Sequence, residues 1–109
     1  MNGLHHVHTR KRIYQNLEQY PSPSLFKRLL DRAIYAAAVA TPLALVPQVV
    51  QVYMARDASG LSFPTWGLLF GIGLLWLLYG IVHREAPLIV THTALMMIHV
   101  AIIVAILLY

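Results

Sequence analysis

The chain has 109 residues, of which 59% are hydrophobic and 11% are charged, whereas charged residues make up about 25% of a typical soluble domain. Water is therefore not the main solvent of this chain, and the composition indicates an integral membrane protein. The net charge of +4 does not indicate nucleic-acid binding, because six of the eight Lys and Arg residues precede the first long apolar run instead of covering a folded face. The absence of cysteine excludes disulfides, thiolate metal sites and a cysteine nucleophile.

Residues 1–23 are polar and basic, and they end in Pro21-Ser22-Pro23, which predicts a mobile tail. The Arg10-Lys11-Arg12 cluster suits the anionic headgroups of membrane lipids. The histidines His5, His6 and His8 have no carboxylate nearby, so this segment is interpreted as solvated rather than as a metal site.

Residues 24–33 place apolar side chains at helical spacing between charged ones. This pattern predicts a short amphipathic helix that lies at the bilayer interface and leads into the first span. The following run, residues 34–54, has no formal charge and is long enough to cross about 30 Å of hydrocarbon. It contains Pro42 and Pro47, each of which removes a backbone donor and tends to kink a helix.

A polar turn at residues 56–60 ends this first span. Ser62 as an N-cap and Pro64 in the first turn then predict a second helix, whose span covers about residues 65–83. Pro87 marks the start of a third helix, whose span covers residues 87–109. The predicted fold class is therefore an all-α membrane protein, a bundle of three transmembrane helices.

No span duplicates another, so residues 34–109 form a single three-helix domain and any symmetry requires a second copy of the chain. The sequence has no Ser/His/Asp set, no paired carboxylates, no HExxH motif and no glycine-rich phosphate loop. We therefore expect no enzymatic activity, no cofactor and no metal site.

Polar or aromatic side chains recur on one face of the second and third spans. These stripes are Trp76, Tyr79 and His83 on the second span, and His92, Met96 and His99 on the third. By the helical rise, Trp76 and His92 lie at a similar depth from the same side of the membrane. An aromatic ring facing a hydrogen-bonding side chain suits a sugar, although such residues also suit simple packing between helices.

Two motifs point to a family. The run Val46-Pro47-Gln48-Val49-Val50-Gln51-Val52, with Gly60-Leu61-Ser62 after a polar turn, resembles the first helix and loop of PQ-loop proteins. The stretch Gly73-Leu74-Leu75-Trp76-Leu77-Leu78-Tyr79-Gly80-Ile81, with its Trp-x-x-Tyr-Gly core, resembles the second helix of the SemiSWEET branch of that family. The resemblance covers about residues 34–109.

SemiSWEET proteins are half-transporters that pair as parallel homodimers around a central sugar route and work by alternating access. The resemblance implies that Pro47 is a hinge and that Gln48 helps to satisfy the backbone it frees near one gate. It also implies that Trp76 of each protomer stacks on the sugar and that Tyr79 belongs to the opposite gate.

The chain departs from the family pattern at two places. The third-helix position where the family usually has an asparagine, as hydrogen-bonding partner of the sugar, is His92, a titratable side chain. The gate usually has Arg-x-Asp after the Tyr-Gly, whereas this chain has His83-Arg84-Glu85. A salt-linked gate would therefore need shifted partners.

The predicted function is passive transport of a small neutral solute, a mono- or disaccharide, by a homodimer in the inner membrane of a prokaryote. The alternative is a non-transporting membrane subunit or adaptor that the three helices only anchor.

Two arguments on the orientation of the chain in the membrane oppose each other. The family likeness places the amino terminus outside, whereas seven of the eight basic residues lie on the amino-terminal side and favour the inside.

Overall fold

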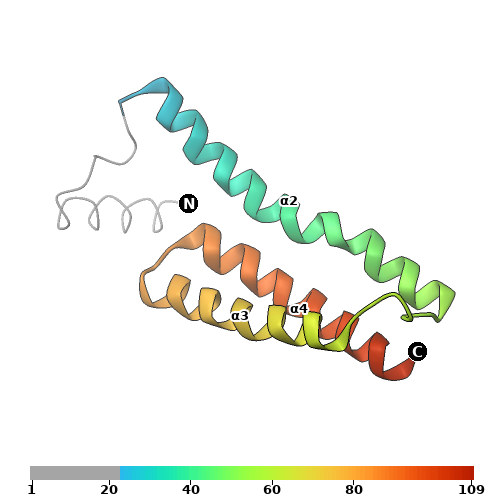
Figure 1. Cartoon of the computed structure of the whole chain (residues 1–109). Helices are drawn as coiled ribbons and strands as arrows, with labels where there is room; N and C mark the ends of the chain where they lie inside the picture. The colour runs from blue at the N-terminus through green and yellow to red at the C-terminus, as the bar shows by residue number, and fades with distance from the viewer. Residues whose placement is uncertain (1–22) are drawn as a thin grey trace. The chain divides into compact units, whose positions relative to one another are not determined.

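A computed structural model describes residues 23–109 of the chain. This part consists of the helices α2 (Leu25–Ala55), α3 (Phe63–Val82) and α4 (Ala86–Leu108), joined by short turns and without any strand (Figure 1). All three helices are long and apolar enough to cross a membrane. The predicted fold class is confirmed. The mobile tail predicted for residues 1–23 lies, except for Pro23, outside the described residues.

The chain divides into two units, and the boundary lies between Ala37 and Ala38. The described part of the first unit is the beginning of α2, and the second unit holds the rest of α2 together with α3 and α4. Helix α2 runs without interruption, so the amphipathic segment 24–33 continues into the first span with no break between them. The placement of that segment at the bilayer interface stays a prediction.

Helix α2 ends in a tight turn at Arg56, which takes a positive φ of 51°. The next amide, that of Asp57, donates to the carbonyl oxygen of Val52 at 3.3 Å, which is the hydrogen bond of a Schellman C-cap. Helix α3 begins at the predicted place, because the Ser62 hydroxyl accepts from the Thr65 amide at 3.4 Å. A cap of this kind contributes about 1 kcal/mol.

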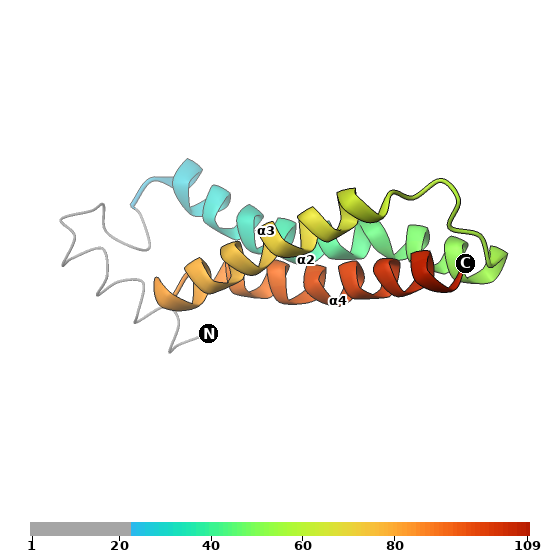
Figure 2. The same ribbon diagram turned by 60° about the horizontal axis from the view of Figure 1, so that its bottom comes forward.

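Helix α3 ends in the same way as α2. Arg84 takes a positive φ of 55°, and the Glu85 amide donates to the carbonyl oxygen of Gly80 at 2.8 Å. Pro87 follows in the first turn of α4. This short turn makes α3 and α4 antiparallel neighbours, and both views show them side by side along their length (Figures 1 and 2).

Two glycines of α3 allow the close approach of α4. A Cβ atom on Gly80 would lie 2.9 Å from Cβ of Leu88 and 3.3 Å from the backbone nitrogen of Ile89. A Cβ atom on Gly73 would collide with the end of the Met96 side chain. By contrast, Gly67 and Gly71 have open space around them within the protomer, so neither makes a close helix contact there.

The end of α2 packs on the end of α4 in a small core beside the turn at residues 56–60. Its buried members are Val52, Ala58 and Ala105, and Tyr53, Leu61 and Ile106 pack around them. The Tyr53 hydroxyl donates to the carbonyl oxygen of Ala101 at 2.6 Å. We call this end of the second unit the loop end, defined by residues 56–62.

Candidate functional site

The rings of Trp76 on α3 and His92 on α4 stack on each other. Their centroids are 6.1 Å apart and their planes differ by 12°. Both side chains belong to the α3–α4 hairpin, so the short turn at His83-Arg84-Glu85 brings them to the same depth. The imidazole lies nearly parallel to the indole at this separation, and 47% of Trp76 remains exposed in the protomer. The pair therefore offers an aromatic surface that the protomer itself does not cover.

His92 also provides an unpaired polar atom. Its Nδ1 is buried and has no hydrogen-bond partner within residues 23–109. A buried polar atom without a partner costs free energy, and an imidazole nitrogen can either donate or accept. Because the protomer itself covers this nitrogen, a hydroxyl from a ligand reaches it only if the imidazole rotates. The geometry thus joins a stacking surface to a hydrogen-bonding atom.

The aromatic stripe of α3 continues from Trp76 toward the turn into α4. The Trp76 and Tyr79 rings meet edge to face at 6.2 Å, and the Tyr79 and His83 rings lie 4.3 Å apart with a tilt of 39°. Tyr79 is 51% exposed. The three predicted stripe residues therefore form one continuous row along the helix, and their role in a gate stays a prediction.

Arg84 and Glu85, the other residues predicted for this gate, lie in the turn itself. Arg84 is exposed and holds the left-handed backbone conformation described above. Glu85 occupies the N-cap position of α4, but its side chain makes no capping hydrogen bond. A salt-linked gate formed by this pair stays a prediction.

Pro47 and Gln48 lie in a different part of the second unit from the Trp76–His92 pair. Pro47 lies inside the continuous α2, where its missing N–H leaves the carbonyl of Leu43 without its usual helical donor. Gln48 lies about two turns from the loop end, whereas Trp76 lies more than about three turns from it. The predicted hinge residues are therefore near the loop end, and the predicted binding pair is nearer the other end.

A second contact between a tryptophan and a histidine was not predicted. The rings of Trp66 and His99 meet edge to face, with centroids 5.7 Å apart and an interplanar angle of 67°. His99 is only 6% exposed, and its Nδ1 also has no hydrogen-bond partner in the described part of the chain. The polar stripe of α4 was visible in the sequence, but nothing in it indicated which tryptophan would meet His99.

Comparisons with known proteins identify the family of the chain. Residues 33–89 match the PQ loop repeat family. The chain is 33% identical over 81 residues to a protein of Vibrio sp. (strain N418) named sugar transporter SemiSWEET, a match that covers 72% of this chain and 84% of the relative. A protein of the same name from Bradyrhizobium diazoefficiens is 37% identical over 71 residues, covering 64% of this chain and 81% of the relative. No solved structure matches the chain significantly.

The three apolar helices define an integral membrane protein. With the family match over residues 33–89 and relatives that align over most of their own length, the chain belongs to the SemiSWEET group of the PQ-loop family.

Proposed function

We propose that the protein transports a small neutral solute, a mono- or disaccharide, passively across the inner membrane of a prokaryote. The stacked Trp76–His92 pair is the observation that carries this proposal. The exposed indole surface suits the CH-bearing face of a sugar ring, and the imidazole of His92 stacked beside it can donate to or accept from a sugar hydroxyl once it rotates its buried Nδ1 outward. The names of the two bacterial relatives support the same class of solute.

The mode of transport follows from the charges in the spans. Residues 34–54, 65–83 and 87–109 contain no Asp or Glu, so no carboxylate inside the membrane is available to carry a coupled proton. Passive movement down the gradient of the solute needs no such group. Coupling of a proton through His92 or His99, which are titratable side chains of the third span, stays the alternative to it. The proposal includes no chemical conversion of the solute and no cofactor.

The proposed assembly is a parallel homodimer that works by alternating access. Three helices alone cannot surround a passage, and one protomer leaves about half of both Trp76 and Tyr79 exposed, at 47% and 51%. A second copy would place a second Trp76–His92 pair across the passage. In this arrangement Pro47 acts as the hinge of the loop-end gate, while Tyr79, His83, Arg84 and Glu85 form the opposite gate.

The test is counterflow of labelled glucose and sucrose into liposomes that contain the purified protein. Accumulation above that of protein-free liposomes is the expected result. The adaptor alternative predicts no counterflow with any solute, and that outcome would overturn the proposal.

A binding measurement separates solute recognition from transport. The chain has two tryptophans, so Trp66→Phe leaves Trp76 as the sole indole fluorophore. Sugar binding at the proposed site should change its emission in a saturable way. The reciprocal Trp76→Phe protein, which keeps only Trp66, should show no saturable change.

A further inference from the structure

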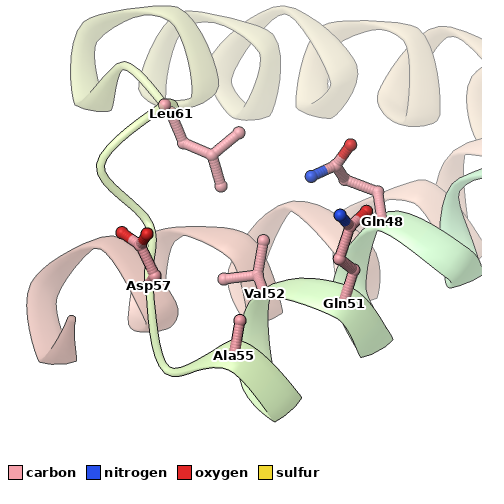
Figure 3. A pocket seen from close by; sticks show the side chains of 7 residues that line it. Gln48, Gln51, Val52, Ala55, Asp57 and Leu61 are labelled. Carbon is pink, nitrogen blue, oxygen red and sulfur yellow. The ribbon is translucent and has the colours of Figure 1, made fainter.

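A pocket of about 330 Å³ lies at the loop end, away from the Trp76–His92 pair (Figure 3). Its polar lining consists of Gln48, Gln51 and Asp57, and its apolar lining includes Val52, Ala55 and Leu61. In Figure 3, Gln48 and Gln51 extend from α2 toward the hollow, Leu61 reaches into it from the other side, and Asp57 lies on the loop. A volume of this size is at the lower end of the range typical of small-molecule sites, about 300–1,000 Å³.

The polar groups of this pocket supply both kinds of hydrogen-bonding capacity. Each glutamine amide has donors and an acceptor, and a carboxylate has only acceptors. One oxygen of the Asp57 carboxylate accepts from the Ser59 amide at 2.9 Å. This hydrogen bond holds the side chain in place and lowers the pKa of Asp57 from its ordinary value of 3.8, so the group stays ionised at physiological pH. Its remaining lone pairs can accept hydrogen bonds from a ligand.

The α2 wall of the pocket is held in place from behind. Val52, which lines the pocket, is 4% exposed and belongs to the small core at the loop end. The neighbouring Tyr53 hydroxyl donates to the Ala101 carbonyl oxygen at 2.6 Å. The pocket therefore has one wall fixed to α4, and this wall directly follows Pro47.

We propose that this pocket is a second, weaker subsite for a polyhydroxylated solute, which the solute occupies between the water at the loop end and the Trp76–His92 site. The proposal rests on the proposed function, because it takes the transported solute to be a sugar. Mixed donors and acceptors beside aliphatic walls suit a sugar, whose hydroxyls alternate with CH groups.

The chemistry of the lining is the reason for proposing that the subsite binds the solute weakly. No tryptophan or tyrosine lines it, so it lacks the stacking surface that would hold a sugar tightly. A site on a transport route must bind well enough for the solute to enter and loosely enough for it to leave. Two amides and one carboxylate without an aromatic surface meet that requirement.

Protection of an introduced cysteine tests the subsite directly. The natural chain has no cysteine, so Ala55→Cys places a single thiol on the lining of the pocket. The protein is placed in lipid nanodiscs, and labelling by a membrane-impermeant maleimide is followed with glucose, with sucrose, or with glycine betaine at equal osmolarity. Ser59→Cys, on the same loop but not on the lining, is the matched control.

We expect either sugar to slow labelling of Ala55→Cys and to leave Ser59→Cys unaffected. Labelling slows by a factor of 1 + [L]/Kd, which is about sixfold at a sugar concentration of about five times Kd. Adding Asp57→Asn, which keeps an oxygen for the Ser59 amide but removes the charge, should raise the protecting concentration about fivefold to tenfold. Gln51→Leu should act in the same direction and serves as the second variant if Asp57→Asn folds poorly.

The same measurement in the Trp76→Ala background separates the two sites. Protection that persists there shows a pocket that binds sugar by itself. Protection that disappears with Trp76→Ala would overturn the subsite, because the slower labelling would then report a conformational change driven from the other site. If sugar gives no protection in a protein that performs counterflow, the subsite is overturned and the proposed function stands. Persistent protection without any counterflow supports the subsite and overturns the proposed transport.

Discussion

The hydroxyl of Tyr53 donates a 2.6 Å hydrogen bond to the carbonyl oxygen of Ala101, and this bond joins the end of α2 to α4. The Tyr53 ring also meets the Tyr109 ring edge to face, with centroids 5.9 Å apart and an interplanar angle of 88°. Both contacts lie beyond Pro47 along α2. The segment between the proposed hinge and the loop end is therefore attached to α4.

Replacing Tyr53 by Phe removes this hydrogen bond and keeps the ring. We expect Tyr53→Phe to lower the free energy of unfolding by about 0.5–1.5 kcal/mol, the usual value of such a bond between membrane helices. Equilibrium unfolding in mixed micelles measures this change. Tyr79→Phe is the matched control, because the Tyr79 hydroxyl makes no hydrogen bond within residues 23–109 and Tyr79 is 51% exposed. Equal losses for the two variants would show that the Tyr53 bond contributes nothing.

Substitutions at two glycines of α3 distinguish packing within the protomer from packing between copies. Gly80→Ala adds a Cβ atom 2.9 Å from Cβ of Leu88 and should destabilise the protomer by about 1–3 kcal/mol. Gly71→Ala meets nothing within 4 Å and should leave the protomer as stable or gain up to about 1 kcal/mol. Unfolding under conditions that keep the protein monomeric gives both values. A Gly80→Ala protein as stable as the natural one would contradict the packing described.

Gly71 provides a related test of the dimer. In a homodimer that uses the open surface around Gly71, Gly71→Leu should reduce the dimeric fraction counted by single-molecule photobleaching in lipid, while the fold of the protomer persists. An unchanged dimeric fraction would remove Gly71 from the interface.

The spans and the common depth of Trp76 and His92 could be predicted from the sequence for simple reasons, whereas the direct stacking of the two rings was not predicted. Apolar runs of this length have few stable alternatives to a spanning helix. Ser62 and Pro64 mark a helix start through local backbone chemistry, and the structure begins α3 at Phe63. The common depth of Trp76 and His92 follows from counting the helical rise on both sides of a short turn.

The remaining contacts could not be predicted, because they depend on rotamers and on tertiary packing. The Trp66 ring lies against His99, and ring direction is not determined by position along a helix. The bond from Tyr53 to Ala101 joins residues 48 positions apart, and the pocket beside it needs the loop folded back on α2. A polar hydroxyl in an apolar run was the available signal for Tyr53.

Pro47 provides a test of the hinge. Pro47→Ala restores an N–H donor for the Leu43 carbonyl, so the helix should become stiffer without losing stability. We expect the rate of counterflow to fall about tenfold in a correctly inserted protein, because opening of a gate often limits the rate. Pro42→Ala is the control, since Pro42 is buried farther from the loop end and should have the smaller effect. Unchanged flux with Pro47→Ala would count against the hinge.

His92 makes uptake depend on pH if it contacts the solute. An imidazole changes its charge near neutral pH, so uptake should vary between about pH 5 and 8. His92→Asn, which restores the amide usual at this position in the family, should keep uptake and flatten the profile. His99→Asn is the control, because His99 contacts Trp66 and not Trp76. If His99→Asn flattened the pH profile and His92→Asn did not, the titrating group would be His99. That result would contradict the role given to His92.

The Trp76–His92 pair as the solute site is the central claim, and counterflow by two matched tryptophan variants tests it most directly. Each tryptophan of the chain contacts one histidine of α4, so Trp76→Ala and Trp66→Ala remove similar contacts at different depths. The account predicts that Trp76→Ala abolishes saturable uptake of labelled sugar while expression and dimer formation persist, and that Trp66→Ala keeps uptake with the same half-saturation concentration. Saturable uptake by Trp76→Ala at the natural half-saturation concentration would contradict it.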